Sequence, residues 1–274
     1  MLPIMYCGND KVFDGMLISL LSVTKHCKEP LDVYVLTMDL RELNEKYCPV
    51  EKAHIDFLEK QIKKVNDESR IHLCDLTEPF KKEMSDCPNL QTNYGPYTLA
   101  RLFADYIEDI PSLILYMDTD TIAHGDISSV FQTDMAGYEY AAAIDYLGKF
   151  FLHYDYQNAG VLLLNMALIK QNGFFARVRE YCRTHKMYFP DQTALNRVVT
   201  KKKFFSTRYN EQRMLHKNTV IQHFSKSIRL WPFYHTINIK PWEIERMHNI
   251  YKIHEYDDVL EEYVVLKKEF EKRS

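Results

Sequence analysis

The stretch "LILYMDTDTIAHGDIS", residues 113–128, decides the fold assignment. Its first five residues are mostly apolar, as in a buried strand, and they lead directly to Asp118 and Asp120. In open α/β sheets, ligands bind at the carboxyl ends of the strands. A buried strand that ends at two carboxylates therefore predicts an α/β fold with a functional site at this edge of the sheet.

Segments typical of strands and helices alternate before this stretch. Apolar runs predict strands at residues 2–8, 31–38, 70–76 and 112–118. Helix-like patterns lie at residues 13–27, 51–66 and 95–107, the last after a Gly-Pro start. This alternation is typical of a Rossmann-like α/β fold, in which helices cover both faces of a mostly parallel sheet.

The second half of the chain continues this pattern less regularly. Further strands are predicted at residues 138–146, 156–166 and 219–224. Helices are predicted at residues 166–185, with a break near Asn172 and Gly173, at 190–199 and from 255 onward. The last helix is acidic first and basic last, which suits the helix dipole. We expect one domain over residues 1–250 and a C-terminal helical appendage over 251–274.

Composition narrows the class of protein. Hydrophobic residues make up 46% of the chain and charged residues 27%, as in soluble globular enzymes. A net charge of -3 without a basic stripe argues against a nucleic-acid partner. The N-terminus lacks the features of a signal peptide, and the six cysteines show no metal-binding spacing. We therefore expect reduced cysteines and a soluble, cytoplasmic protein.

Asp118 and Asp120 are placed to share one divalent cation. Mg²⁺ and Mn²⁺ bind through one or two carboxylates plus substrate phosphates, and such a metal neutralises a departing diphosphate. Two alternatives stay open. The aspartates could be solvated residues of a capped loop. They could also belong to a phosphohydrolase of the haloacid-dehalogenase type that uses a DxDxT motif, with Asp118 as nucleophile, Asp120 as general acid and a later acidic pair at Asp257 and Asp258.

The order and spacing of several motifs over residues 2–242 resemble glycosyltransferase family 8. The motifs are ARLFADYI, LILYMDTDTIAHGDIS, AAAIDY, YQNAGVLLLNM, PDQTALN, HF and KPW. The resemblance implies a GT-A fold and a retaining, metal-dependent transferase. Such an enzyme moves glucose or galactose from a UDP-sugar to a glycan, glycolipid or glycoprotein acceptor. It also implies Mn²⁺ or Mg²⁺ bound by Asp118, Asp120 and His223.

Further roles are implied by the same resemblance. Gln192 matches a residue near the anomeric carbon in a front-side mechanism, Asp191 would orient the donor sugar, and Asp145 would lie near sugar and acceptor. The residues implied in binding the UDP-sugar are Cys7, Gly8, Asn9, Asp10, Arg101, Asp118, Thr119, Asn158 and Lys240.

The chain departs from the family pattern at two places. Extra residues over 224–239 separate His223 from Lys240, so Lys226 could replace the lysine and His235 the metal-binding histidine. Val12 stands where a tyrosine that stacks on uridine is expected, and Phe13 could substitute. These departures favour a third interpretation, a catalytically silent homologue that binds UDP-sugars.

The resemblance also implies partners and location. Several such transferases act on carbohydrate or lipid-linked acceptors at the inner face of a bacterial membrane, which would suit a cytoplasmic protein with peripheral membrane contact. The aromatic and basic segment 225–238 is the candidate for contact with the acceptor or the membrane surface.

Overall fold

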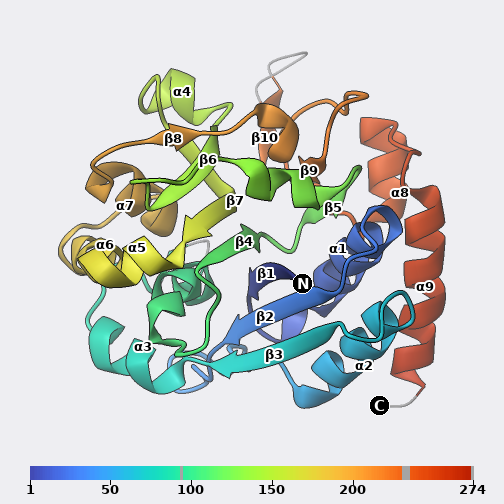
Figure 1. Ribbon diagram of the computed structural model, residues 1–274, viewed down its shortest axis with the longest axis horizontal. Helices are drawn as coiled ribbons and strands as arrows, with labels where there is room; N and C mark the ends of the chain where they lie inside the picture. The colour runs from blue at the N-terminus through green and yellow to red at the C-terminus, as the bar shows by residue number, and fades with distance from the viewer. Residues whose placement is uncertain (93–94, 230–234, 273–274) are drawn as a thin grey trace.

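The computed structural model describes residues 1–92, 95–229 and 235–272. Its centre is a seven-stranded sheet (Figure 1). Its strands lie in the order β3-β2-β1-β4-β7-β6-β8. Their bounds are β1 Leu2–Cys7, β2 Leu31–Thr37, β3 Arg70–Asp75, β4 Leu113–Met117, β6 Tyr140–Ile144, β7 Gln157–Asn165 and β8 Lys203–Phe204. β7 is antiparallel to both neighbours, whereas the other described pairs are parallel. The predicted mostly parallel α/β sheet is confirmed.

Two hydrophobic cores lie on opposite faces of the sheet. Along β1, Ile4 and Tyr6 belong to one core and Met5 to the other, because successive side chains of a strand point to opposite faces. The first core includes residues of α1 Phe13–His26, α2 Lys52–Lys63 and α9 Asp257–Glu271. The second includes residues of α3 Thr77–Met84, α5 Met166–Asn172, α6 Phe174–Thr184 and α7 Pro190–Val198. Helices on both faces explain why strands such as β2 and β7 are buried along almost their whole length, whereas β3 at the edge of the sheet is partly exposed.

The C-terminal helix α9 lies alongside α1 (Figure 1). Its residues Val259, Leu260, Tyr263 and Leu266 are buried in the same core as α1. Lys267 Nζ also lies 2.7 Å from Asp14 Oδ2 of α1. The predicted helix is confirmed, and the division of the chain near residue 250 stays a prediction. Among the described residues, no helix is long and apolar enough to cross a membrane.

Several elements differ from the expected ones. The segment 95–107 forms a 3₁₀ helix, η2 Pro96–Tyr106. The sequence predicted a helix here but not its type, because a short apolar pattern does not separate 3.0 from 3.6 residues per turn. The predicted strand 219–224 is β9 Ile221–His223, which pairs with β5 Thr121–Ala123 outside the central sheet. The helix 166–185 is interrupted at Gly173, which has a φ of 64°. That break agrees with the prediction.

Short elements complete the chain. The segment 225–238 contains an antiparallel pair, β10 Ser227–Arg229 and β11 His235–Ile237. The remaining elements are η1 Asp10–Val12, η3 Ile127–Gln132, α4 Gly148–Phe151, η4 Thr207–Tyr209, α8 Ile244–Arg246 and the π-helix η5 Met247–Tyr251.

Candidate functional site

The turn after β4 carries Asp118 and Asp120 to the carboxyl end of the sheet. The Asp118 amide donates to Gly160 O of β7 at 2.7 Å, which fixes the start of the turn. The chain continues into β5, where Thr121 pairs with His223 of β9. The Phe224 amide donates to Asp120 O at 2.9 Å. This small second sheet therefore brings His223 to the two aspartates.

Each aspartate has one oxygen held by a neighbouring donor and one directed toward His223. Tyr116 Oη and Arg101 Nη2 donate to Asp118 Oδ1, the latter at 3.0 Å. Lys240 Nζ donates to Asp120 Oδ2. The other two oxygens, Asp118 Oδ2 and Asp120 Oδ1, lie 3.7 and 3.3 Å from His223 Nε2. These three atoms lie within 4.8 Å of one another.

The orientation of His223 is set by Asn210, which sequence analysis did not single out. His223 Nδ1 lies 3.1 Å from Asn210 Oδ1. Asn210 Nδ2 donates to Asn158 Oδ1 at 2.9 Å, and this bond fixes the amide so that its oxygen accepts from Nδ1. In the neutral imidazole the proton then resides on Nδ1, and the lone pair of Nε2 faces the carboxylates, where a cation can take it. Asn210 lies in an irregular segment, where no periodic pattern could have marked it.

The residues present fit a divalent cation. Asp120 Oδ1 is buried and has no hydrogen-bond partner among the residues that the structure describes. An unpartnered carboxylate oxygen, a second carboxylate oxygen and an imidazole lone pair form a donor set suited to Mn²⁺. The side chain of His235, the alternative ligand, lies outside the described part of the chain.

The charges of neighbouring side chains determine in which direction the pKa values of Asp120 and His223 shift. Burial alone would raise the pKa of Asp120, but the charges of Lys240 and His223 outweigh it and lower that pKa. Burial alone would lower the pKa of His223, but Asp120 outweighs it and raises that pKa. The side chain of Asp120 is 13% exposed and held by Lys240, so the interpretation of the aspartates as solvated loop residues is wrong.

Arg101 connects the aspartates to α7. It is buried in η2, and its Nη1 donates to Ala159 O at 2.5 Å. Its Nε lies 3.5 Å from Asp191 Oδ2, and its guanidinium carbon lies 4.0 Å from the Tyr116 ring centroid. Burial raises the pKa of Asp191, although Arg101 opposes this. The planar guanidinium thus holds two carboxylates, one from the turn after β4 and one from α7.

Asp145 anchors the amides of Gln192 and Asn158. Gln192 Nε2 and Asn158 Nδ2 donate to Asp145 Oδ2 at 3.2 and 2.7 Å, and the Gly148 amide donates to Asp145 Oδ1 at 2.5 Å. Gln192 Oε1 accepts from the Ala159 amide at 2.8 Å. Gln192 is therefore held at both ends, and its carbonyl oxygen keeps a second lone pair.

Many of the predicted site residues line one cleft of about 1100 Å³. They are Arg101, Asp118, Asp120, Asp145, Asn158, Asp191, Gln192, His223 and Lys240. Lys226, the alternative to Lys240, also lines it. The structure therefore brings the predicted metal, catalytic and sugar-facing residues to a common cavity, although they come from η2, β7, α7, β9 and the turns after β4, β6 and β11.

The N-terminal candidates lie at the carboxyl end of β1. In the described part of the chain, Cys7, Gly8, Asn9, Asp10 and Thr119 do not line this cleft. The Gly8 amide donates to Leu36 O at 3.0 Å, and Asn9 Oδ1 accepts from the Lys11 amide at 3.3 Å. Burial raises the pKa of Cys7, which is close enough to Arg101 to feel its charge. Their role in binding a nucleotide stays a prediction.

Thr119 and Phe13 are packed against other parts of the fold. A Cβ on Gly15 of α1 would meet the Thr119 carbonyl oxygen, so the turn after β4 lies directly against α1. Phe13 is buried, with its ring centroid 4.5 Å from that of Phe270 and 4.8 Å from that of His54. The expectation that Phe13 replaces a stacking tyrosine is therefore wrong, because its ring is part of the core.

Sequence comparisons place the chain among glycosyltransferases. A family model described as glycosyl transferase family 8 matches residues 3–245. The chain is 28% identical over 150 residues to glycosyltransferase GlyA of Streptococcus pneumoniae, and 23% identical over 211 residues to a putative glycosyltransferase of Haemophilus influenzae. These matches cover 52% and 71% of this chain, but 20% and 58% of the relatives. The chain thus spans less than two thirds of either relative.

Solved structures share the fold. The galactosyltransferase LgtC, in complex with donor and acceptor sugar analogs, has a TM-score of 0.71 at 17% identity, over 94% of this chain and 95% of that one. Glycosyltransferase GlyE of Streptococcus pneumoniae has a TM-score of 0.63 at 17% identity, over 96% of this chain and 63% of that one. These likenesses confirm the expected GT-A fold.

Proposed function

Because the chain belongs to glycosyltransferase family 8, we propose that it is a retaining transferase that moves glucose or galactose from a UDP-sugar to a glycan, glycolipid or glycoprotein acceptor. Family membership supports glycosyl transfer, and the activity, donor, stereochemistry and acceptor are our proposal. The observation that carries it is the convergence of Asp118 Oδ2, Asp120 Oδ1 and His223 Nε2 in a cleft that also contains Gln192.

Asp118, Asp120 and His223 would hold Mn²⁺ or Mg²⁺. When bound, the cation supplies positive charge that offsets the charge of the departing diphosphate. The imidazole nitrogen favours Mn²⁺, because Mg²⁺ prefers oxygen ligands. In the described structure Lys240 supplies positive charge to Asp120, so its ammonium group is already beside the place that a diphosphate would occupy.

The donor sugar would bind between Arg101, Asp191 and Asn158. Hydroxyl groups of a sugar both donate and accept hydrogen bonds, and carboxylate and amide side chains complement them. Arg101 fixes the position of Asp191 through a contact of 3.5 Å. Asp145 fixes Asn158 through a hydrogen bond of 2.7 Å. Both groups are therefore held in place before a sugar binds.

The hydrogen bonds support a front-side mechanism. Both oxygens of Asp145 already accept hydrogen bonds, from Gly148, Asn158 and Gln192, so we assign it to positioning rather than to nucleophilic attack. Gln192 Oε1 carries a partial negative charge and a second lone pair. We propose that it stabilises the positive charge that develops at the anomeric carbon as the bond from that carbon to the diphosphate oxygen breaks. The acceptor hydroxyl then bonds to the same carbon from the face of the departing diphosphate, whose oxygen takes the hydroxyl proton.

The acceptor would enter past the β10–β11 pair. Lys226, Ile228 and Thr236 of the predicted contact segment line the cleft. On α4, Phe151 lines the cleft and is 71% exposed. Aromatic and aliphatic side chains at the opening suit the apolar faces of a sugar or the lipid part of an acceptor. The similarity of fold to a galactosyltransferase, LgtC, is consistent with a hexose donor.

The phosphohydrolase interpretation is wrong. Family membership decides against it, and Ile122 of β5 stands where a DxDxT motif starting at Asp118 requires threonine. The later acidic pair is also engaged elsewhere, because Asp257 binds two histidines and Asp258 binds Lys25.

Titration calorimetry of UDP, with and without Mn²⁺, tests the proposal. The variants are Asp120→Ala and, as a matched control, Asp134→Ala, an exposed aspartate of the loop between η3 and β6. We expect Mn²⁺-dependent binding of UDP that is lost in Asp120→Ala and kept in Asp134→Ala. Hydrolysis of UDP-glucose and UDP-galactose would then identify the donor. Binding of UDP without turnover on any acceptor would favour the silent homologue, and no binding of UDP at all would contradict the proposal.

A further inference from the structure

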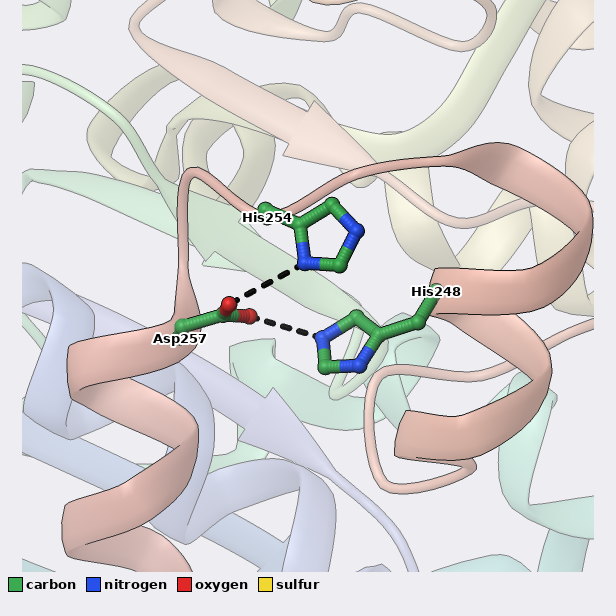
Figure 2. A group of neighbouring side chains, drawn as sticks. All are labelled: His248, His254 and Asp257. Carbon is green, nitrogen blue, oxygen red and sulfur yellow. Dashed lines mark hydrogen bonds and ion pairs between the residues drawn. The ribbon is translucent and has the colours of Figure 1, made fainter.

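A second group of metal-binding side chains lies at the start of α9. His248 comes from η5, His254 from the following turn and Asp257 from the first turn of α9 (Figure 2). His248 Nε2 lies 2.7 Å from Asp257 Oδ1, and His254 Nδ1 lies 3.1 Å from Asp257 Oδ2. The two rings stack with centroids 4.4 Å apart and an angle of 25° between their planes. Figure 2 shows both imidazole edges directed at the same carboxylate.

The backbone takes two uncommon conformations to bring these side chains together. Residues 247–251 form a π-helical turn, which is rare in proteins and is often found at functional sites. Lys252 then adopts a left-handed conformation with a φ of 57°. Residues other than glycine seldom adopt this conformation. The turn reverses the chain, so that the start of α9 faces η5.

The chemistry of the group is that of a metal site. Two imidazole nitrogens and one carboxylate are a ligand set for Zn²⁺ and other late first-row divalent ions. With bonds of about 2.0–2.1 Å, neighbouring ligand atoms lie about 2.9–3.4 Å apart. The two nitrogen–oxygen distances of 2.7 and 3.1 Å are close to this range. Within the described chain, Asp257 is paired with these histidines and with no lysine or arginine.

We propose that His248, His254 and Asp257 form a second metal site, for Zn²⁺ or a similar ion such as Co²⁺ or Ni²⁺, separate from the proposed Mn²⁺ site. His254 is exposed, so an ion can enter from solvent and water can complete its coordination. The ion would replace the protons that now lie between the imidazoles and the carboxylate.

The position of this site links it to the cleft. Tyr251, Lys252, Ile253 and Glu255, which lie between its ligands in sequence, line the cleft. Tyr251 Oη also lies 3.5 Å from Ser227 Oγ of β10. An ion bound by His248, His254 and Asp257 would join η5 to α9 and thereby hold this wall of the cleft in place. The inference does not depend on the identity of the donor or the acceptor.

Titration calorimetry with Zn²⁺ tests the site in the Asp120→Ala background, where the other cation site is disabled. The added substitutions are His254→Ala, His248→Ala and, as a matched control, His153→Ala. His153 is also an exposed histidine paired with one carboxylate, that of Asp155, and it belongs to neither metal-binding group of the described residues. We expect one equivalent of Zn²⁺ in the parent and in the control. The affinity should fall by about tenfold or more in His254→Ala and in His248→Ala.

Two further measurements guard against misfolding of a variant. The wild-type chain should take up two equivalents of Zn²⁺ and the single variant His254→Ala one. Co²⁺ should give a visible absorption band in the Asp120→Ala protein that is absent after His254→Ala. Equal Zn²⁺ affinity with and without His254, in proteins with the same circular dichroism spectrum, would overturn the proposal. The group would then be a hydrogen-bonded cap of α9.

Discussion

His223 Nδ1 donates to the amide oxygen of Asn210 over 3.1 Å, and this bond decides which imidazole nitrogen faces Asp118 and Asp120. The chain of hydrogen bonds continues from Asn210 to Asn158 and from Asn158 to Asp145, at 2.9 and 2.7 Å. The metal-binding histidine and the proposed catalytic amide of Gln192 are thus oriented through one buried polar network. Every intermediate amide in it uses its oxygen and its nitrogen.

We expect Asn210→Leu to weaken Mn²⁺ binding by about 10–100-fold, as is typical when the hydrogen-bond partner of a metal ligand is removed. His223 could then rotate or change tautomer, and the lost hydrogen bonds should lower the free energy of unfolding by about 1–3 kcal/mol. Calorimetry with Mn²⁺ and thermal unfolding would measure both effects. Asn66→Leu is the control, because Asn66 bonds to Lys28 O on the exterior. Unchanged Mn²⁺ affinity in Asn210→Leu would show that Asn210 does not position His223.

A second prediction concerns Gly160 of β7. A Cβ at this position would overlap the imidazole of His223, so Gly160→Ala must displace the ring. We expect lower Mn²⁺ affinity together with a loss of about 1–3 kcal/mol in the free energy of unfolding, which is typical of overpacking. Gly125→Ala is a matched control, because its Cβ would meet no described atom closer than 3.4 Å. Equal Mn²⁺ affinity in the two variants would contradict the tight packing of His223 against β7.

The parts of this site differ in how far the sequence could predict them. Asp118 and Asp120 follow a continuous apolar strand, so their position at the carboxyl end of the sheet was accessible from pattern alone. His223 was implied by the family resemblance, and it lies on β9, outside the central sheet. Asn210 could not be predicted, because its segment is held beside β9 by the pairing of Glu211 with Gln222, a contact that no periodicity encodes. Longer strands such as β2 were predicted within a residue or two, because all of their residues are buried. The hairpin β10–β11 was missed, because its strands are short and carry no apolar alternation.

Asp191 predicts a specific dependence of stability on pH. Burial raises its pKa in the folded protein, so the folded state binds this proton more tightly than the unfolded state. The protonated group therefore favours folding at low pH, and this contribution is lost as the pH rises through the raised pKa, above the ordinary value of about 3.9. We expect the melting temperature of Asp191→Asn, relative to wild type, to increase as the pH rises from about 3.5 to about 6. The exposed control Asp134→Asn should show no such trend, and a constant difference for Asp191→Asn would refute the assignment.

Arg101→Lys tests whether geometry, rather than charge alone, is needed between Asp118 and Asp191. The guanidinium contacts Ala159 O, Asp118 and Asp191 with three different nitrogens, at 2.5, 3.0 and 3.5 Å. An ammonium group cannot reproduce this planar arrangement. We expect the free energy of unfolding to fall by about 1–3 kcal/mol and the hydrolysis of UDP-sugar to slow by at least about tenfold. Arg197→Lys, on the exposed side of α7, serves as the control and should change neither quantity.

The contact of Lys240 with Asp120 leads us to expect that removing the lysine affects metal binding and nucleotide binding in opposite directions. Its ammonium group is bound to Asp120 and to Phe224 O, the latter at 3.0 Å, so it competes with a cation for Asp120. We expect Lys240→Met to bind Mn²⁺ alone at least as tightly as wild type, because the competing charge is gone. The same variant should bind UDP in the presence of Mn²⁺ more weakly, by about 1.5–3 kcal/mol, the usual contribution of a hydrogen bond to a charged group. Calorimetry with Mn²⁺ and then with UDP separates the two effects.

Lys226→Met is the matched comparison, because Lys226 lines the same cleft but has no ion pair among the described residues. If Lys226→Met alone binds UDP more weakly, the diphosphate contact belongs to Lys226. If Lys240→Met loses affinity for both Mn²⁺ and UDP, Lys240 supports the metal site instead of competing with it.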